Sequence, residues 1–294
     1  MAQRILVTGG SGQLAQALGE AGGERVLVVG RPVFDFDRPE TIAAVFRAGN
    51  PWLVVNAAAY TAVDAAEKDE AAALRANRDG PAELARLCAE AGVPLIHVST
   101  DYVFDGSKPE PYVETDAVSP QSVYGASKLA GEFGVQMAGA RAIVIRTAWV
   151  YAATGRNFVR TMLELAKTRD RLRVVADQMG CPTAADDLAA AILAIADRIE
   201  SGGWKDAYRG VLHVAGAGET TWHGLAEAVF AEAARHGAKV PEAVEPIATS
   251  DYPTPAKRPA NSRLNCARLE TVFGVKMPDW RDGVTRTVGR MFAA

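Results

Sequence analysis

Cysteine is scarce in this sequence and is not arranged in pairs. The three cysteines among 294 residues, Cys88, Cys181 and Cys266, lie far apart along the chain. This spacing matches neither a disulfide framework nor a cysteine-based metal site. We therefore expect small buried or half-buried thiols in a reducing compartment.

The sequence also lacks a membrane-spanning apolar run and an excess of charge of one sign. The stretch LAAAILAIA over 188–196 is too short to cross a membrane and is flanked by acidic residues. No secretory segment precedes the first apolar strand, which begins at Arg4. A net charge of −3 and a pI near 5.9 give no electrostatic reason to bind nucleic acid or a membrane surface. We expect a soluble cytoplasmic protein with neither partner.

Internal repeats, low-complexity tracts and groups of His, Asp or Glu at metal-ligand spacing are missing as well, so the sequence predicts no metal site. What is present is an ordinary globular mixture of 49% hydrophobic and 23% charged residues. The length suits one large domain or two closely joined ones.

Short apolar runs alternate with amphipathic helical segments. Helices are expected directly after the first glycine turn, over 39–48, and in a long segment that ends at Gly92. The apolar runs show no two-residue alternation, which is typical of strands covered on both faces. The pattern predicts an α/β fold with a Rossmann-type doubly wound parallel sheet. Strands are expected from Arg4 and over 25–30, 52–59, 94–100, 142–151, 171–177 and 210–216.

The regular alternation loosens from about Asn157 onward. Loops and a proline-rich stretch over 246–262 follow. We expect a dinucleotide-binding Rossmann domain and a smaller C-terminal α/β substrate-binding lobe over the carboxyl ends of its strands. The predicted bounds are 1–150 plus about 184–215 for the domain, and 151–183 and 216–294 for the lobe.

The first strand runs into a glycine turn that opens a helix. Gly9, Gly12 and Ala15 stand at a G-x-x-G-x-x-A spacing. Glycine lets the backbone approach a pyrophosphate, and the start of the helix offers unpaired N–H groups. A small residue suffices in the third position, where helix and strand pack together. This turn predicts a dinucleotide site, with an ordinary tight turn as the alternative.

The end of the second strand bears on which dinucleotide is bound. Gly30 stands where an acidic ribose-binding residue is expected, and Arg31 follows it. A basic residue here favours NADPH, because it can pair with the 2′-phosphate. Asp35 and Asp37 lie close by and offer contacts to the adenosine ribose instead, so NADH remains the alternative.

A tyrosine and a lysine four residues apart, Tyr124 and Lys128, fall on one face of a predicted helix. The pair decides nothing by itself. However, the strand over 94–100 ends in Ser99 and Thr100, followed by Asp101, and ligands bind at the carboxyl ends of such strands. A hydroxyl there can hold a carbonyl oxygen within reach of the tyrosine; a threonine that caps its own turn is the alternative.

These motifs together resemble a known superfamily. Gly9-x-x-Gly12-x-x-Ala15, NAAAYTAVDAAE, STDYVFDG and VYGASKLAGE occur in the order typical of extended short-chain dehydrogenases/reductases. With RTAWVY, DQMGCPT and RPANSRL, they resemble the dTDP-4-dehydrorhamnose reductase family from residue 4 to about 290. The chain departs from the usual pattern at Ala15 and at Gly30.

The resemblance implies an activity and roles for three residues. The activity is reduction of the C4 keto group of dTDP-4-dehydro-L-rhamnose to dTDP-L-rhamnose by NADPH. Tyr124 would donate the proton, and Lys128 would favour the tyrosinate form and reach the nicotinamide ribose. Thr100 would hydrogen-bond the developing alkoxide. The implied reaction needs no metal, although members of the family can bind a structural Mg²⁺. The resemblance also allows a homodimer.

The resemblance also assigns binding residues. Trp149 has a packed core aromatic as its alternative, and Arg258 a solvated loop cation. The residues assigned to the pyrophosphate, the adenosine and the far side of the cofactor are Gly12, Gln13, Leu14, Asp35, Phe36, Ala59, Tyr60 and Thr61. Those assigned to the sugar nucleotide are Thr100, Asp101, Trp149, Asn157, Gln178, Arg258 and Asn261.

Other functions stay open at this point. The same core serves reductases of other 4-keto-6-deoxy nucleotide sugars, because substrate choice resides in the loops of the second lobe. A regulatory subunit that binds a dinucleotide without turnover is a second alternative, and a 4-epimerase a third. The complete set of Thr100, Tyr124 and Lys128 favours the reductase.

Overall fold

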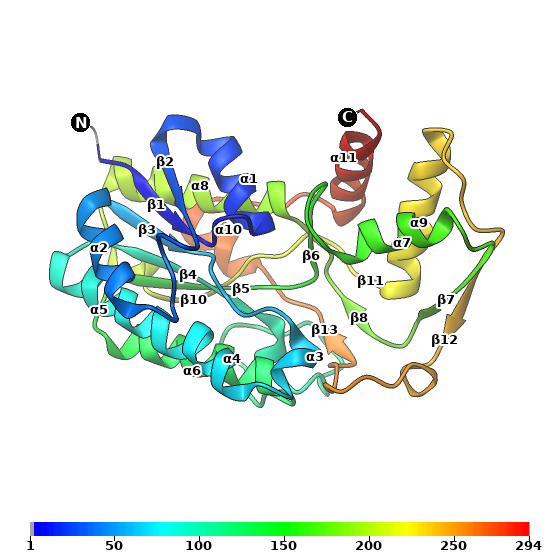
Figure 1. Cartoon of the computed structure of the whole chain (residues 1–294), viewed down its shortest axis with the longest axis horizontal. Helices are drawn as coiled ribbons and strands as arrows, with labels where there is room; N and C mark the ends of the chain where they lie inside the picture. Colours follow the sequence, from blue (N-terminus) through cyan, green and yellow to red (C-terminus); the bar gives the residue numbers. More distant parts are fainter. Residues whose placement is uncertain (1–2, 294) are drawn as a thin grey trace.

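A six-stranded parallel sheet forms the centre of the protein (Figure 1). The computed structural model describes residues 3–293. The strand order of this sheet is β10-β5-β4-β3-β1-β2, and every neighbouring pair is parallel. This confirms the predicted doubly wound α/β fold. The strands are β1 (Ile5–Thr8), β2 (Val26–Val29), β3 (Leu53–Asn56), β4 (Leu95–Thr100), β5 (Ala142–Thr147) and β10 (Gly210–His213).

Helices cover both faces of this sheet. Ile5 and Val7 of β1 point into one apolar cluster with α1 (Gln13–Gly22) and α8 (Ala185–Gly202). Leu6, between them, points into a second cluster on the opposite face. Because helices cover both faces, the strands show no alternation of apolar and polar residues. The helices of the second face are α2 (Pro39–Gly49), α5 (Gly80–Ala91) and α6 (Val123–Met137).

A second group of elements lies beyond the carboxyl ends of the strands, to the right in Figure 1. Helices α7, α9 and α11 share an apolar cluster with strand β7, which pairs in parallel with β12. Segment 185–213 returns to the central sheet, because α8 packs on α1 and β10 pairs with β5. The exact division into two lobes stays a prediction. Bounds are α7 (Phe158–Ala166), α9 (Trp222–Arg235), α11 (Trp280–Ala293), β7 (Arg171–Val175) and β12 (Ala243–Ile247).

The remaining short elements connect these layers. Strands β11 (Thr220–Thr221), β8 (Met179–Gly180) and β13 (Asn261–Ser262) form a three-stranded sheet, and β6 (Val150–Tyr151) pairs with β9 (Thr183–Ala184). The short helices are α3 (Val63–Ala66), α4 (Glu70–Leu74) and α10 (Ala267–Phe273). Among the described helices, none is both long and apolar enough to cross a membrane.

Two predicted elements differ from the structure. The strand expected over 142–151 is interrupted, because Trp149 adopts a left-handed backbone conformation with φ 50°. Beyond this break, β6 leaves the central sheet and pairs with β9. The long helical segment that ends at Gly92 is also divided, into α3, α4, a π-helical turn (Arg75–Asp79) and α5.

A buried ion pair fastens α6 to the sheet. Arg146 on β5 donates from Nε and Nη2 to the Glu132 carboxylate, at 2.9 and 2.6 Å. Ser99 on β4 donates to the same carboxylate at 2.5 Å. The Glu132 and Arg146 side chains are 1% and 5% exposed, so water does not replace a lost partner. The position of α6 over β4 and β5 therefore depends on this pair.

We expect Glu132→Gln to lower the free energy of unfolding by about 3–5 kcal/mol, because it leaves the Arg146 charge buried without a counter-charge. Urea unfolding of both proteins measures the change. Glu90→Gln is the matched control: it breaks an ion pair with Arg86 whose side chains are 60% and 50% exposed. We expect less than about 1 kcal/mol there. Equal effects in the two variants would contradict a structural role for the buried pair.

Candidate active site

The glycine turn between β1 and α1, residues 9–12, is called the cradle below. Gly9 and Gly10 have φ values of 114° and 49°, which favour glycine. The Gly12 N–H donates to the Gly9 carbonyl at 2.8 Å, and the start of α1 has no side-chain cap. The N–H groups of the first turn of α1 are thus offered to a ligand. This geometry fits the pyrophosphate of a dinucleotide.

The structure explains why glycine replaces the expected acid after β2. A Cβ on Gly30 would lie 2.5 Å from the Cα of Gly10, so no side chain fits there. Arg31, two-thirds exposed, donates to Asp35 at 3.0 Å and to Asp37 at 2.9 Å. Arg75 also donates to Asp37, at 3.0 Å. Any phosphate bound here would therefore share Arg31 with two carboxylates.

The other residues assigned to the cofactor lie around this cradle in different ways. The side chains of Leu14 and Phe36 are buried in the core, so contacts to a ligand would come from their backbone. Gln13 accepts a hydrogen bond from the Asn157 amide at 2.8 Å, which joins the start of α1 to the loop before α7. Ala59, Tyr60 and Thr61 follow β3 in an irregular loop.

Asn77 holds that loop, and sequence reasoning missed it. Its Oδ1 accepts from the Tyr60 N–H at 2.8 Å, and its Nδ2 donates to the Tyr60 carbonyl at 3.1 Å and to Ser127 Oγ at 2.9 Å. Ser127 in turn donates to the Tyr124 carbonyl. Asn77 lies in the π-helical turn, a feature frequent at functional sites. The surrounding charges look like a solvated helix face in the sequence, which hides the inward turn of this one residue.

Helix α6 brings Tyr124 and Lys128 to the sheet. Ser122 caps the helix by accepting from the Gly125 N–H at 3.1 Å. Lys128 is 2% exposed, and its Nζ donates to the Val98 carbonyl at 2.6 Å. Burial lowers the pKa of Lys128 to about 8 and raises the pKa of Tyr124 to about 12. Burial is the main cause of the raised pKa of Tyr124, and the role of Lys128 in favouring the tyrosinate stays a prediction.

Thr100 and Asp101 end strand β4 beside Tyr124. Burial raises the pKa of Tyr124 by more than the Thr100 hydroxyl lowers it. Thr100 Oγ1 donates to Asp101 Oδ1 at 2.9 Å and accepts from the Tyr102 N–H at 3.2 Å. The resemblance implies that the Thr100 hydroxyl donates to the alkoxide of the substrate. In this structure the hydroxyl donates to the Asp101 carboxylate instead. Burial raises the pKa of Asp101 to about 6, although hydrogen bonds from Ser262 and Thr100 oppose this shift.

A cavity of about 710 Å³ is lined in part by Tyr102, which follows Asp101 in the chain. Gln178 and Arg258, both predicted from the sequence, line it. The Tyr102 ring packs edge-to-face on Tyr124 with the centroids 5.4 Å apart. The cavity therefore extends to the residue that packs on Tyr124. Further lining comes from α7, β7, the start of α9 and the segment 247–258, with Phe158, Val174, Trp222 and Ile247 as apolar members.

Trp149 and Trp222 form a stacked pair beside this cavity. Their ring centroids are 3.5 Å apart at an angle of 9°. Gly180 also lies against the Trp149 ring, since a Cβ there would lie 2.3 Å from Trp149 Cε2. Trp149 is half-buried and is not among the residues that line the cavity, whereas Trp222 lines it. Sequence reasoning missed Trp222, because a tryptophan at the start of an amphipathic helix looks like a core residue.

Of the seven residues predicted to bind substrate, Gln178 and Arg258 line the cavity, whereas Thr100, Asp101, Trp149, Asn157 and Asn261 are not among its lining residues. The side chains of Asn157 and Asn261 are engaged elsewhere. Asn157 caps α7 by accepting from the Arg160 N–H at 3.0 Å, and its Nδ2 donates to Gln13 and Ala152. Asn261 donates to the Lys108 and Glu110 carbonyls, at 2.6 and 2.8 Å. Both amides thus hold loops in place, and neither residue is part of the cavity lining.

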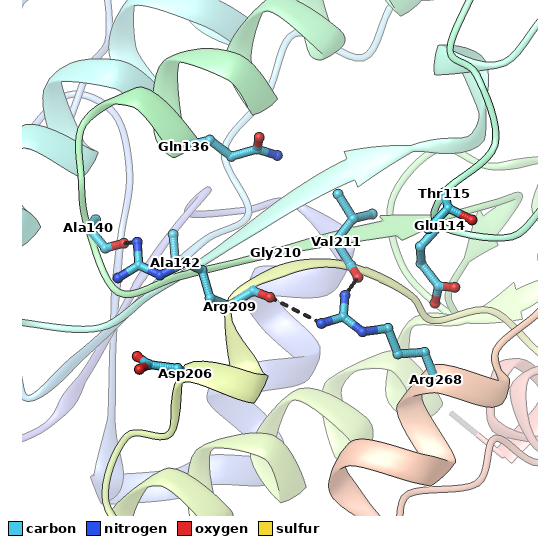
Figure 2. A pocket seen from close by; sticks show the side chains of 10 residues that line it. All are labelled: Glu114, Thr115, Gln136, Ala140, Ala142, Asp206, Arg209, Gly210, Val211 and Arg268. Atoms are coloured by element: carbon cyan, nitrogen blue, oxygen red, sulfur yellow. Dashed lines mark hydrogen bonds between the residues drawn. The ribbon is translucent and has the colours of Figure 1, made fainter.

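A second cavity, of about 520 Å³, lies at the amino ends of β5 and β10 (Figure 2). Arg268 donates to the carbonyls of Val211 and Arg209 along the free edge of β10. Ligands of open α/β sheets bind at the carboxyl ends instead. Among residues 3–293, no group of three or more His, Cys, Asp or Glu side chains is arranged to hold a metal ion.

The cradle, the buried Tyr124–Lys128 pair and the Thr100 hydroxyl together define a dinucleotide-binding site of the extended short-chain dehydrogenase/reductase class. Comparisons with known proteins identify the family within this class. The family model described as RmlD substrate binding domain matches residues 3–292. A dTDP-4-dehydrorhamnose reductase of Sinorhizobium fredii is 48% identical over 290 residues, 97% of this chain and 96% of the relative. One of Burkholderia thailandensis is 47% identical over 291 residues, 96% of each.

Solved structures agree with these relatives. A dTDP-4-dehydrorhamnose reductase of Clostridium acetobutylicum matches with a TM-score of 0.88 and 36% identity, covering 98% of this chain and 99% of that one. Another, of Bacillus anthracis in complex with NADP, matches with a TM-score of 0.89 and 32% identity, covering 99% and 100%. The chain belongs to the dTDP-4-dehydrorhamnose reductase family.

Asp101→Asn is expected to stabilise the protein increasingly as the pH rises from 4 to 7. The pKa of Asp101 is raised to about 6 by folding, from 3.8, so the native carboxyl binds its proton more tightly than the unfolded one. Ionisation of Asp101 therefore lowers the free energy of unfolding of the wild type as the pH rises through this window, by an amount on the order of 3 kcal/mol. Urea unfolding of both proteins at several pH values measures the difference.

Asp105→Asn is the control, and its effect has the opposite sign. Hydrogen bonds from Ser107 and Tyr112 lower the pKa of Asp105, so its stabilising contribution is present above pH 4 and lost below it. This variant should be less stable than the wild type at pH 7 and approach it at low pH. If the difference in free energy of unfolding between the wild type and Asp101→Asn stayed constant across pH 4–7, the raised pKa of the buried Asp101 would be contradicted.

Proposed function

We propose that the protein reduces the C4 keto group of dTDP-4-dehydro-L-rhamnose to a hydroxyl with NADPH, forming dTDP-L-rhamnose. The observation that carries this proposal is the buried Tyr124 on α6, one helical turn from the buried Lys128, packed against Tyr102, which lines the 710 Å³ cavity. Two relatives more than 45% identical are named for this reaction.

The proton transfer is assigned to Tyr124. When bound, the reduced nicotinamide supplies a hydride to C4. Tyr124 donates its proton to the carbonyl oxygen, which becomes the new hydroxyl. A phenol with a pKa raised by burial stays protonated at neutral pH and is ready to donate. Lys128, held against the Val98 carbonyl, places a positive charge one helical turn away to offset the tyrosinate that remains.

Thr100 and Asp101 lie beside the donor. Thr100 directs its own proton to Asp101, and its hydroxyl opposes the larger effect of burial on the pKa of Tyr124. We assign to Thr100 the stabilisation of the developing alkoxide once its proton turns from Asp101 to the substrate. We assign Gln178 and Arg258 to the sugar nucleotide, because both line the cavity, and Trp149 to the support of Trp222, on which it stacks.

We propose NADPH as the preferred cofactor. A Bacillus anthracis relative was solved in complex with NADP. In this chain Arg31 lies where a 2′-phosphate would be bound, and no acidic side chain fits at Gly30. The cytoplasmic location, the homodimer and the two-lobe boundaries stay predictions alongside this one.

Replacement of Tyr124 by Phe tests the proton donor. We expect kcat to fall at least 100-fold, because general acid catalysis contributes roughly 10²–10⁴-fold. The assay follows loss of NADPH absorbance with dTDP-4-dehydro-L-rhamnose generated in situ. NADPH affinity, measured by fluorescence titration, should stay within about twofold.

Tyr208→Phe is the control, since Tyr208 is buried against Phe273 in a distant part of the core. Normal turnover of Tyr124→Phe would refute the assignment of the acid. If the wild-type protein binds NADPH but does not oxidise it, other 4-keto-6-deoxy nucleotide sugars are tested next, and a regulatory subunit after them.

Arg31→Ala tests the cofactor preference. We expect KM for NADPH to rise about tenfold and KM for NADH to stay within about twofold, because only NADPH carries the 2′-phosphate. Steady-state kinetics with both cofactors measure the ratio. Arg47→Ala, an exposed charge removal on α2, should change neither value. An equal rise for both cofactors after Arg31→Ala would contradict phosphate recognition by this residue.

A further inference from the structure

A strap of residues 249–258 crosses one side of the 710 Å³ cavity, and residues on both lobes hold it. At its start, the Thr249 N–H and hydroxyl donate to Asp177 at 2.9 and 2.6 Å. Near its end, Arg258 pairs with Asp64 of α3, which is 194 positions away in the sequence. The strap therefore joins the central-sheet side of the site to the β7 side.

Asp64 binds the strap at three points. Its two carboxylate oxygens accept from Arg258 Nη1 at 2.5 Å and from Nη2 at 2.6 Å. Its Oδ1 also accepts from the Ala256 N–H at 3.1 Å. The Arg258 side chain is 21% exposed, and the hydrogen bond to Arg258 lowers the pKa of Asp64, so the carboxylate is ionised at neutral pH. Such a bidentate pair fixes the plane of the guanidinium.

The donors of Arg258 can be counted. Nη1 gives one hydrogen to Asp64 and one to the Ala256 carbonyl, at 2.8 Å. Nη2 gives one hydrogen to Asp64. Of the five N–H donors of a guanidinium, this leaves Nε–H and the second hydrogen of Nη2. Among residues 3–293, no protein acceptor is found for these two, which lie on the same edge of the group.

That free edge has the geometry of a phosphate-binding fork. Nε–H and Nη2–H are parallel donors, the arrangement in which arginine binds two oxygens of one phosphate. Arg258 and Asp64 both line the cavity, and Tyr102, which packs on Tyr124, lines it beside them. A diphosphate bound by this edge would place an attached sugar toward the reactive tyrosine.

We propose that Asp64 is a positioning residue: it holds Arg258 so that the free Nε/Nη2 edge binds the diphosphate of the sugar nucleotide. This deepens the proposed function and rests on it. If Asp64 instead competed with the diphosphate for Arg258, removal of the Asp64 charge would strengthen substrate binding. That result would overturn the proposal.

The test is a double-mutant cycle of Asp64→Asn and Arg258→Ala in the full chain. We expect each single variant to raise KM for the sugar nucleotide about tenfold, with kcat and KM for NADPH within about twofold. The double variant should be no worse than Arg258→Ala, because Asp64 acts only through that arginine. Calorimetric titration with dTDP gives the same comparison without turnover, and Asp64→Glu should recover part of the loss.

Asp197→Asn is the matched control, since Asp197 pairs with Arg25 on an exposed surface away from the cavity. Additive effects of the two variants, or an unchanged or lowered KM and dTDP dissociation constant for Asp64→Asn, would overturn the proposal. A wild-type chain that binds dTDP but does not oxidise NADPH would refute the proposed function while leaving the binding comparison valid.

Discussion

The active site depends on one buried ion pair, Glu132 with Arg146. It joins α6 to β5, and the hydrogen bond from Ser99 adds β4. Tyr124 and Lys128 lie on α6, whereas Thr100 and the Val98 carbonyl belong to β4. The contacts between these two pairs therefore need helix and strand in fixed register. Desolvation makes a buried ion pair costly, so its value here lies in fixing that position more than in net stability.

Burial has opposite consequences for the groups placed this way. It raises the pKa values of Tyr124 and Asp101 and lowers that of Lys128. At neutral pH the site consequently holds a protonated phenol and a lysine that is still mostly charged. In the proposed reaction, such a phenol would give up its proton as charge develops on the bound carbonyl.

Sequence patterns predicted the parts of the molecule that local rules determine. Buried apolar runs revealed the parallel strands, and the glycines of the first turn revealed the cradle. The positive φ of Trp149 was not visible, because nothing in an apolar run marks one residue for a left-handed conformation. Asn77 was hidden by charged neighbours that face solvent.

Residues brought together across long stretches of chain were the least predictable part of the site. The roles of Asn157 and Asn261 as loop anchors follow from carbonyls placed near them by the tertiary fold. The same holds for the Trp149–Trp222 stack and for Asp64 with Arg258. A motif identifies a residue type at a position, and only the fold decides whether its polar atoms are still free.

The most direct test of the central claim is the fate of the hydride. The wild-type protein is incubated with dTDP-4-dehydro-L-rhamnose and NADPH deuterated on either face of nicotinamide C4, and the product is examined by NMR and mass spectrometry. The account predicts one deuterium at sugar C4 from one of the two cofactors and none from the other. A product without deuterium, or with deuterium at another carbon, would contradict hydride transfer to the C4 keto group.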